Sequence, residues 1–255
     1  MTVAVSDIVF YLTGAAEDGG AQADPAASLG KYRSSTVAIP ATAIDDGDGI
    51  SDADTTITVD ATAAFAASGY IWIETECIAY TGKGATTFTG CTRGSLSTDA
   101  AAHDDDAVIW QVSTLLDAIS GTDSQAGDTE YGCLCAKNTN GADAANAVAI
   151  YLSAATGNAE DVISFAVEVP TGGDTDGYAQ EIETESDAPT VNAGNVSNWS
   201  TATTYGTAIG VDQGAHDANL DAGELVFIWL KRVVSAGADA VAVERVDPVV
   251  AFDTV

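Results

Sequence analysis

Residues 70–90 read "YIWIETECIAYTGKGATTFTG", three short apolar runs separated by small and polar residues. Short runs rich in Ile, Tyr, Trp, Phe and Thr are typical of β-strands, and clusters of Gly and Thr between them mark turns. The spacing predicts a three-stranded meander, with its turns at residues 74–75 and 81–85.

The rest of the chain has the same texture, because helical periodicity is nearly absent and Gly, Asp, Asn and Pro fill the gaps between apolar runs. Short strands at close intervals are typical of sandwiches and barrels. We therefore predict an all-β protein built on an immunoglobulin-like or jelly-roll-type β-sandwich. Strands are expected at residues 3–12, 56–59, 70–73, 76–80, 86–90, 107–112, 130–137, 147–152, 161–169, 224–233 and 241–251.

Strand length divides the chain into two parts. Residues 1–38 and 113–255 combine long strands with long polar loops, and we expect them to form the sandwich. Residues 39–112 pack shorter strands closely, which predicts a small β-barrel-like module inserted into the first domain. The most apolar stretch, "LVFIWLKRVV" at 225–234, predicts a central strand buried on both faces, with Lys231 and Arg232 emerging at its end.

The charge balance is extreme, with 38 acidic residues against 8 basic ones and a net charge of −30. Such a surface repels nucleic acid, because phosphate contacts need Lys and Arg. Self-repulsion destabilises the folded state in dilute buffer, and at about 1 M salt the Debye length of roughly 3 Å removes most of it. Acidic, Lys-poor composition is typical of proteins from extreme halophiles, and a merely acidic protein from an ordinary organism is the alternative.

Targeting signals are not expected. No stretch approaches the roughly 18 uninterrupted apolar residues of a membrane span. Residues 1–10 lack a basic region and include Asp7, so we expect no signal peptide.

The four cysteines give no metal motif. Cys133 and Cys135 form Cys-Leu-Cys on an expected strand and share one face of it. Cys77 and Cys91 lie on neighbouring expected strands, which allows a disulfide between them without requiring one. Small buried thiols are the favoured interpretation.

The acidic stretch "DDGDGISDAD", residues 45–54, partly matches a calcium-binding loop. With Gly49 at the sixth position of an EF-hand loop, Asp48 and Asp46 fall at the fifth and third, but the first and last ligand positions hold Ile and Thr. We therefore favour an acidic turn that holds calcium, magnesium, sodium or potassium ions loosely, and we expect no dedicated cofactor. The candidate ligands are Asp46, Asp48, Asp52 and His103.

Catalytic motifs are absent from the sequence. There is no nucleophile elbow, no Walker loop and no dinucleotide-binding glycine motif after a strand. Two carboxylates for glycoside hydrolysis cannot be selected among 38 acidic residues. We predict that the protein is not an enzyme; the rival prediction, a depolymerase, needs an acidic cleft that the sequence does not locate.

Residues 71–112 also carry a specific pattern: an apolar strand, a strand from Glu to Tyr, Thr-Gly, Thr-Gly-x-Thr-Arg-Gly, Thr, Ala-Ala-His and a final Val strand. This pattern resembles a small β module of tailed-phage structural proteins, especially tail and baseplate components. It departs from them at "HDDDAV", where a Gly usually precedes the final strand. The matching positions are Glu76, Ile78, Tyr80, Thr81, Gly82, Phe88, Thr89, Gly90, Thr92, Arg93, Gly94, Thr98, Ala101 and His103.

The flanking segments are similar to a family of phage virion proteins. The similarity lies in "DPAASLG" at 24–30, "GDTEYGC" at 127–133 and "IWLKR" at 228–232, and it is poor from about 153 to 215. Gly132 stands where the family usually has Arg, which puts in doubt any ion pair made by that Arg. The shared motifs are structural and transfer no catalytic residue.

The resemblance implies a structural component of a tailed virus, and the acidic, Lys-poor composition adds the expectation that its host is a halophilic archaeon. It would be made in the host cytoplasm and exposed on the virion, in the tail or baseplate first and as a capsid decoration or turret second. In the inserted module, Arg93 and His103 would fix the turns through hydrogen bonds, together with Gly90 and Gly94.

Partners are expected to be copies of the protein itself and other virion proteins, with neither nucleic acid nor a membrane. The sparse cations mark candidate contacts, and three of them occur late in the chain: Lys231, Arg232 and Arg245. Trp199, beside the sequons at Asn195 and Asn198, is the fourth candidate. If Trp199 does not fold back on its own core, it favours an alternative of another class, a module that binds a host receptor, glycan or S-layer.

Overall fold

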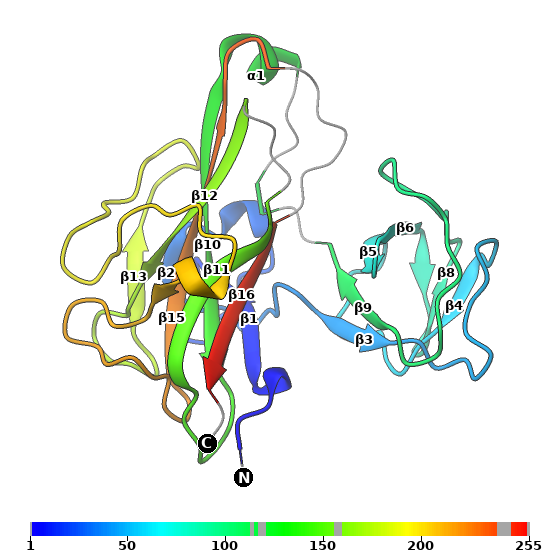
Figure 1. Ribbon diagram of the computed structural model, residues 1–255, viewed down its shortest axis with the longest axis horizontal. Coiled ribbons are helices and arrows are strands. Elements are labelled where there is room, and N and C mark those ends of the chain that lie inside the picture. The colour runs from blue at the N-terminus through cyan, green and yellow to red at the C-terminus, as the bar shows by residue number, and fades with distance from the viewer. Residues whose placement is uncertain (1, 113–114, 117–120, 156–159, 239–245, 254–255) are drawn as a thin grey trace. The chain divides into compact units, whose positions relative to one another are not determined.

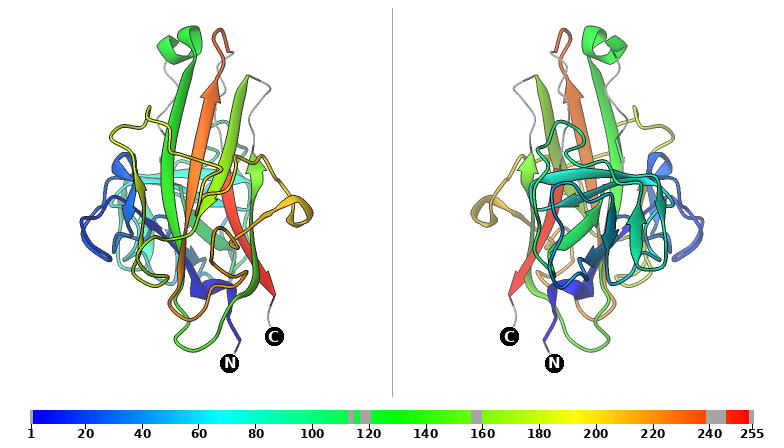
Figure 2. Two further views of the ribbon diagram at one scale, coloured as in Figure 1. Left: turned by 90° about the vertical axis from the view of Figure 1, so that its left-hand side faces the viewer. Right: turned by 90° about the vertical axis from the view of Figure 1, so that its right-hand side faces the viewer.

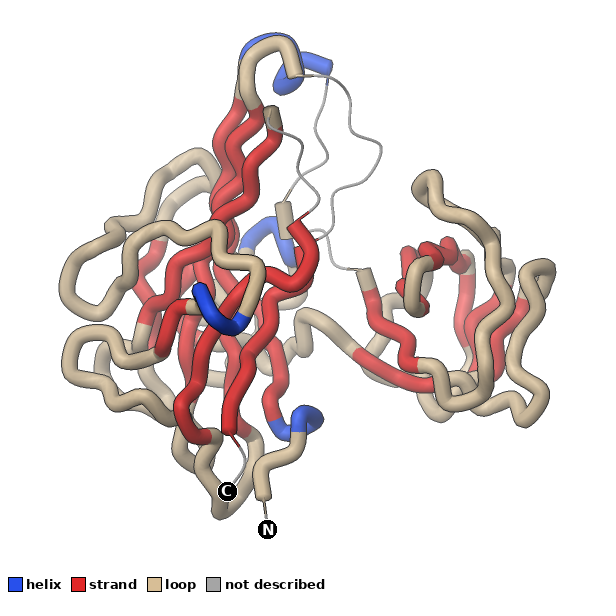
Figure 3. The backbone as a smooth tube through the Cα atoms, viewed as in Figure 1, coloured by secondary structure: helices blue, strands red, loops and turns tan. Residues whose placement is uncertain are grey.

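The computed structural model describes residues 2–112, 115–116, 121–155, 160–238 and 246–253 (Figure 1). Strand makes up 42% and helix 6% of the structure, which confirms the predicted all-β, sandwich-type class (Figure 3). The chain separates into two compact units. Unit 1 comprises Met1–Ala38 and Thr114–Val255, and unit 2 comprises Ile39–Ser113.

Unit 1 is organised around a four-stranded antiparallel sheet. Its order is β1 (Ile8–Leu12), β10 (Asp128–Asn138), β15 (Leu225–Val234) and β12 (Asp161–Glu168). The strand β15 is central, and its first six residues are all buried, as its continuous apolar sequence predicts. Its end differs from the expectation: Lys231 is half-buried, and Arg232 does not emerge but is only 6% exposed.

A second antiparallel sheet of unit 1 has the order β14 (Ile209–Gly210), β11 (Asn146–Ala155) and β16 (Val246–Asp253). Its strand β11 contacts β12 of the main sheet (Figure 2). The short strands β13 (Tyr178–Glu181) and β2 (Gly30–Tyr32) pair separately. A core cluster beside them includes Phe227 and Trp229 of β15 together with Ala179 of β13.

The helical elements of unit 1 are short. They are three 3₁₀-helices, η1 (Val5–Asp7), η2 (Pro25–Ala27) and η3 (Tyr205–Thr207), and the α-helix α1 (Gly121–Ala126). The expected first strand is therefore wrong over residues 5–7, where the amide of Ala4 donates to the carboxylate of Asp7 and the amide of Asp7 donates back to the carbonyl of Ala4. These two local bonds hold a turn in place of an extended strand.

Unit 2 contains two separate antiparallel sheets. The first has the order β3 (Ala41–Ala43), β9 (Val108–Gln111), β5 (Gly69–Ile73) and β6 (Glu76–Tyr80). The second has the order β4 (Thr56–Thr58), β8 (Thr87–Thr89) and β7 (Gly82–Lys83). The described residues form no closed barrel, so the expected barrel-like closure is not seen in them.

The predicted three-stranded meander is correct only for its first hairpin, β5–β6. Its third strand, β8, pairs with β4 and β7 in the other sheet. The change of sheet occurs at Thr81, whose amide donates to the carbonyl of Thr89 directly after β6 ends. Phe88 of β8 then lies 4.8 Å, centroid to centroid, from the ring of Tyr80 in β6.

The core of unit 2 lies between these strands and is almost entirely aliphatic and aromatic. The buried residues are Ile44, Ile50, Ile57, Val59, Phe65, Ile71, Ile73, Ile78, Tyr80, Phe88, Cys91 and Ile109. Alternation along β5 turns Ile71 and Ile73 into this core and leaves Tyr70 and Trp72 on the opposite face.

Candidate functional site

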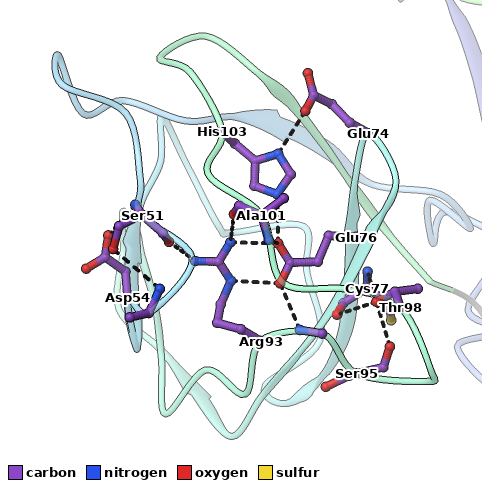
Figure 4. A network of polar contacts seen from close by, with 12 residues as sticks. Ser51, Asp54, Glu74, Glu76, Cys77, Arg93, Ser95, Thr98, Ala101 and His103 are labelled. Atoms are coloured by element: carbon purple, nitrogen blue, oxygen red, sulfur yellow. Dashed lines mark hydrogen bonds and ion pairs between the residues drawn. The ribbon is translucent and has the colours of Figure 1, made fainter.

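The carboxylate of Glu76 is the centre of a buried polar network in unit 2 (Figure 4). Glu76 is the first residue of β6 and is 0% exposed. Arg93 follows the turn at Gly90, and His103 lies in the segment that leads to β9. Three segments that are separate in the sequence therefore converge on one side chain.

Both oxygens of Glu76 are fully used as acceptors. The guanidinium of Arg93 donates to them from Nε at 2.9 Å and from Nη2 at 2.6 Å. The backbone amides of Gly94 and Ala101 donate at 2.8 and 3.2 Å. His103 Nε2 lies 2.8 Å from Oε2.

Burial raises the pKa of Glu76, but the hydrogen bonds from Arg93, Gly94, His103 and Ala101 outweigh it and lower the pKa to about 2. The carboxylate is therefore ionised at every pH at which the protein is expected to work. An ionised group with this many donors is a structural anchor, since it has no proton to give and accepts one only in strong acid.

The rest of the Arg93 guanidinium binds backbone carbonyls. Nη2 also donates to the carbonyl of Ala101 at 2.5 Å, and Nη1 donates to the carbonyl of Ser51. The planar fork thus joins the loop at Ser51, the loop at Ala101 and the start of β6.

His103 lies between two carboxylates and is 3% exposed. Its Nδ1 is 2.9 Å from Oε2 of Glu74, in the turn between β5 and β6. Each ring nitrogen of His103 thus lies within hydrogen-bonding distance of a carboxylate oxygen, and the tautomer sets which of them donates. The backbone of His103 pairs with that of Ile50, which fixes the ring in place.

Two glycines shape the turns around the network. Gly90 and Gly94 have φ of +63° and +58°, in the left-handed region that favours glycine. A Cβ on Gly90 would lie 2.1 Å from Oγ1 of Thr81, and one on Gly94 would lie 2.9 Å from the carbonyl oxygen of Thr98. The turn role predicted for Arg93, His103, Gly90 and Gly94 stays a prediction until their contribution to stability is measured.

The candidate metal ligands do not converge. Asp46, Asp48 and Asp52 are exposed in the turn at 45–54, whereas His103 is engaged by Glu74 and Glu76. Across the residues that the structure describes, no group of three or more His, Cys, Asp and Glu side chains is arranged to hold a metal ion.

The candidate contact residues lie in different environments. Arg232 is paired with the carboxylate of Glu130, and both side chains are buried. Lys231 Nζ lies 4.9 Å from the centre of the Trp199 ring, and that ring packs against Tyr131 at 5.8 Å between centroids. Trp199 thus folds back on unit 1, which does not favour it as a free sugar-binding platform.

Arg245 lies outside the described residues. Of the three late cations, Lys231 alone is placed with partial exposure.

The four cysteines are buried thiols, so the disulfide that the sequence allows between Cys77 and Cys91 is not formed. Burial raises the pKa of the Cys91 thiol to about 11, only partly opposed by Arg93. Burial also raises the pKa of Cys133 and of Cys135. Thiols with raised pKa are poor nucleophiles at neutral pH.

The segments 24–30, 127–133 and 228–232 also come together in unit 1. Ser28, in the "DPAASLG" loop, donates from Oγ to the carbonyl of Cys133 at 2.6 Å. Gly30 ends that loop with φ of +91°, and a Cβ there would lie 1.9 Å from the carbonyl oxygen of Gln180 and 2.9 Å from the Trp229 ring. The loop is therefore fitted closely against β10, β13 and β15.

Unit 1 also has a pocket of about 350 Å³, whose lining includes Tyr11, Arg33, Lys137 and Asn140. Its cations are engaged: Arg33 pairs with Asp18 at 3.0 Å and lies over the Tyr11 ring, and Lys137 donates to the carbonyl of Thr175.

Sequence reasoning did not predict that Arg93 and His103 share one partner, the carboxylate of Glu76. The signal was a Glu at the start of an otherwise apolar strand, which calls for a buried partner. The partner could not be chosen from sequence, because Arg93 is 17 and His103 27 residues away.

Comparison with models of protein families, with curated proteins and with solved structures found no match to this chain. No helix in the described part of the chain has the length and apolar character needed to cross a membrane.

Proposed function

We propose that the protein is a non-enzymatic structural component of a tailed virus particle, exposed on the particle and assembled through repeated protein–protein contacts. The tail or baseplate is the favoured location, because the pattern in unit 2 resembles modules of tail and baseplate proteins. Head decoration or a capsid turret is the alternative location.

The observation that carries this proposal is the network at Glu76. The residues that make unit 2 resemble a phage module are scattered in the sequence, yet five of them bind one another: Glu76, Arg93, Gly94, Ala101 and His103. Their polar groups are used to join loops to a strand. A module whose characteristic residues hold its own shape suits a repeated part of an assembly.

The charge distribution supports a halophilic host as part of the same proposal. Three of the eight Lys and Arg residues, Arg33, Arg93 and Arg232, are already paired with a carboxylate and do not offset the remaining acidic charge. The remaining surface is strongly acidic, and concentrated salt screens the resulting repulsion.

The proposal is tested by sedimenting virus particles from cultures that make the protein in a density gradient. We expect the protein in the particle band, at a fixed ratio to the major capsid protein that does not change on a second gradient. An acidic host protein of similar mass serves as the control for carry-over. A protein that stays with the soluble host fraction, or whose ratio falls on repeated purification, would overturn the proposal.

A further inference from the structure

One face of the sheet β3-β9-β5-β6 in unit 2 carries an exposed group of large apolar side chains. Alternation turns Ile71, Ile73 and Ile109 into the core, where each is 0% exposed. Their neighbours along the strands point to the opposite face, which we call the aromatic face. It consists of Tyr70, Trp72, Val108 and Trp110.

The members of the aromatic face are adjacent. Trp72 and Trp110 are directly paired across β5 and β9. Trp110 is 43%, Val108 48% and Tyr70 38% exposed. Trp72 is half-buried, and its ring N–H donates to the carbonyl of Glu74 at 2.7 Å, which fixes the orientation of the ring.

Small residues lie opposite three members of this group on the neighbouring strands. Ala41 and Ala43 lie opposite Trp110 and Val108 on β3, and Ala79 lies opposite Tyr70 on β6. Single exposed apolar residues are ordinary, but contiguous exposed apolar patches mark interaction sites. Trp and Tyr are also the residues that most often dominate the energy of an interface.

Charge indicates what kind of partner fits. Unit 2 contains twelve Asp and Glu residues against two Lys and Arg residues, a formal net charge of −10 with His103 neutral. Both cations are bound within the unit: Arg93 to Glu76, and Lys83 Nζ to the carbonyls of Thr62 and Phe65 at 2.6 and 2.5 Å. Unit 2 as a whole is therefore strongly acidic and has no spare cation of its own.

We propose that the aromatic face is a docking surface for a protein segment that carries Lys or Arg beside apolar side chains. The apolar side chains would pack on the rings, and the cations would meet the electron-rich ring faces and be attracted by the net negative charge of unit 2. A second copy of unit 2 would bring the same net charge of −10 and no spare cation. The partner is thus a different, basic surface. This inference rests on the proposed function, because it names the partner class for one of the assembly contacts.

The test uses the full chain labelled with 5-fluorotryptophan, so that its four Trp residues give separate ¹⁹F signals, assigned by Trp→Phe variants. The probe is a short peptide of alternating Arg and Leu at about 1 M KCl, where long-range charge effects are screened. We expect the signals of Trp72 and Trp110 to shift, with those of Trp199 and Trp229 unchanged. Peptides of Arg with Ser and of Asp with Leu should each bind at least about tenfold more weakly.

Two substitutions locate the binding. Trp110→Ala should weaken binding of the Arg-Leu peptide at least about tenfold, and Val108→Ser, which keeps both Trp rings, should weaken it less. The matched control is Tyr205→Ala, which removes an exposed aromatic of unit 1 and should leave binding unchanged. The melting temperature of each variant shows that it is folded.

The inference would be overturned if the Arg-Ser or the Asp-Leu peptide bound as tightly as the Arg-Leu peptide. It would also be overturned if Trp110→Ala left the affinity for the Arg-Leu peptide unchanged. A neutral oligosaccharide such as maltoheptaose is tested in the same way. If it shifts the signals of Trp72 and Trp110 and the Arg-Leu peptide does not, the partner is a glycan and the inference of a protein partner is overturned. The proposed function is tested separately by the sedimentation of virus particles. If the protein binds the peptide but is absent from particles, the docking surface is supported and its role in a virion is not.

Discussion

The guanidinium of Arg93 and the carboxylate of Glu76 form a two-point ion pair inside unit 2, with Nε–Oε1 and Nη2–Oε2 distances of 2.9 and 2.6 Å. The side chains are 6% and 0% exposed. Removing one partner of such a pair leaves the other charge buried and uncompensated, which costs far more than the loss of a surface pair.

Arg93→Ala is therefore expected to destabilise unit 2 by about 3–5 kcal/mol. Thermal unfolding in concentrated salt measures the effect, followed by the assigned ¹⁹F signals of Trp72 and Trp110 for unit 2 and of Trp199 and Trp229 for unit 1. The control is Lys31→Ala, which removes a pair with Glu181 whose side chains are 38% and 57% exposed, and which should cost no more than about 1 kcal/mol. A melting temperature that Arg93→Ala leaves unchanged would contradict the structural role of the network.

Glu76 should make stability depend on pH in the acid range. Its pKa is lowered from 4.5 to about 2 in the folded protein, so the unfolded chain binds the proton more readily. The stabilisation is present above about pH 4.5 and is lost as the pH falls toward 2. Urea unfolding of the wild type and of Glu76→Gln over this range, at constant salt, checks it. The difference between the two proteins should shrink as the pH falls, and a constant difference would show that Glu76 does not titrate as described.

Gly30 should tolerate no side chain, because a Cβ there would lie 1.9 Å from the backbone oxygen of Gln180 and its φ is +91°. We expect Gly30→Ala to lower the melting temperature of unit 1 strongly or to prevent folding. Gly206→Ala is the matched control in the same unit, since a Cβ on Gly206 meets nothing within 4 Å. Equal melting temperatures of the two variants would show that the "DPAASLG" loop does not fit against β13 and β15 as described.

The net charge of −30 predicts stabilisation by salt. Raising KCl from about 0.1 to 1 M shortens the Debye length from about 10 to 3 Å and removes most of the self-repulsion. The melting temperature should rise steeply over that range, and further in more concentrated salt. A melting temperature indifferent to salt would rule out adaptation to brine.

The four thiols should be unreactive in the native state, because all are buried and the pKa of Cys91 is raised to about 11. Titration with a disulfide reagent should label none rapidly before unfolding and all four after it. Only two thiols labelled after unfolding would indicate a disulfide that the structure does not contain.

The sequence predicts the strands with strong apolar signals and misses those without one. Each expected strand overlaps a strand of the structure, although residues 241–245 of the last lie outside the described part. The short strands β2, β3, β7, β13 and β14 are not predicted, because their two to four residues lack the run of β-branched and aromatic residues that marks the equally short β4, β8 and β9. Their pairing is decided by tertiary contacts.

The site shows the same division. Arg93 and His103 could be picked out as turn residues from their place in a pattern. Their common partner could not, because the contact with Glu76 depends on how the loops at Ser51 and Ala101 close. The burial of Arg232 was missed for a similar reason. Its partner Glu130 lies 102 residues away on β10, and only the register of β10 with β15 brings the two together.

The most direct test of the central proposal is a cryo-electron microscopy map of virus particles purified from cultures that make the protein. The proposal predicts density that fits unit 1 and unit 2, repeated by the symmetry of the tail or baseplate. Copies on the head would keep the structural role and move its location to the capsid. A map whose tail, baseplate and capsid density is wholly assigned to other chains would contradict the proposal.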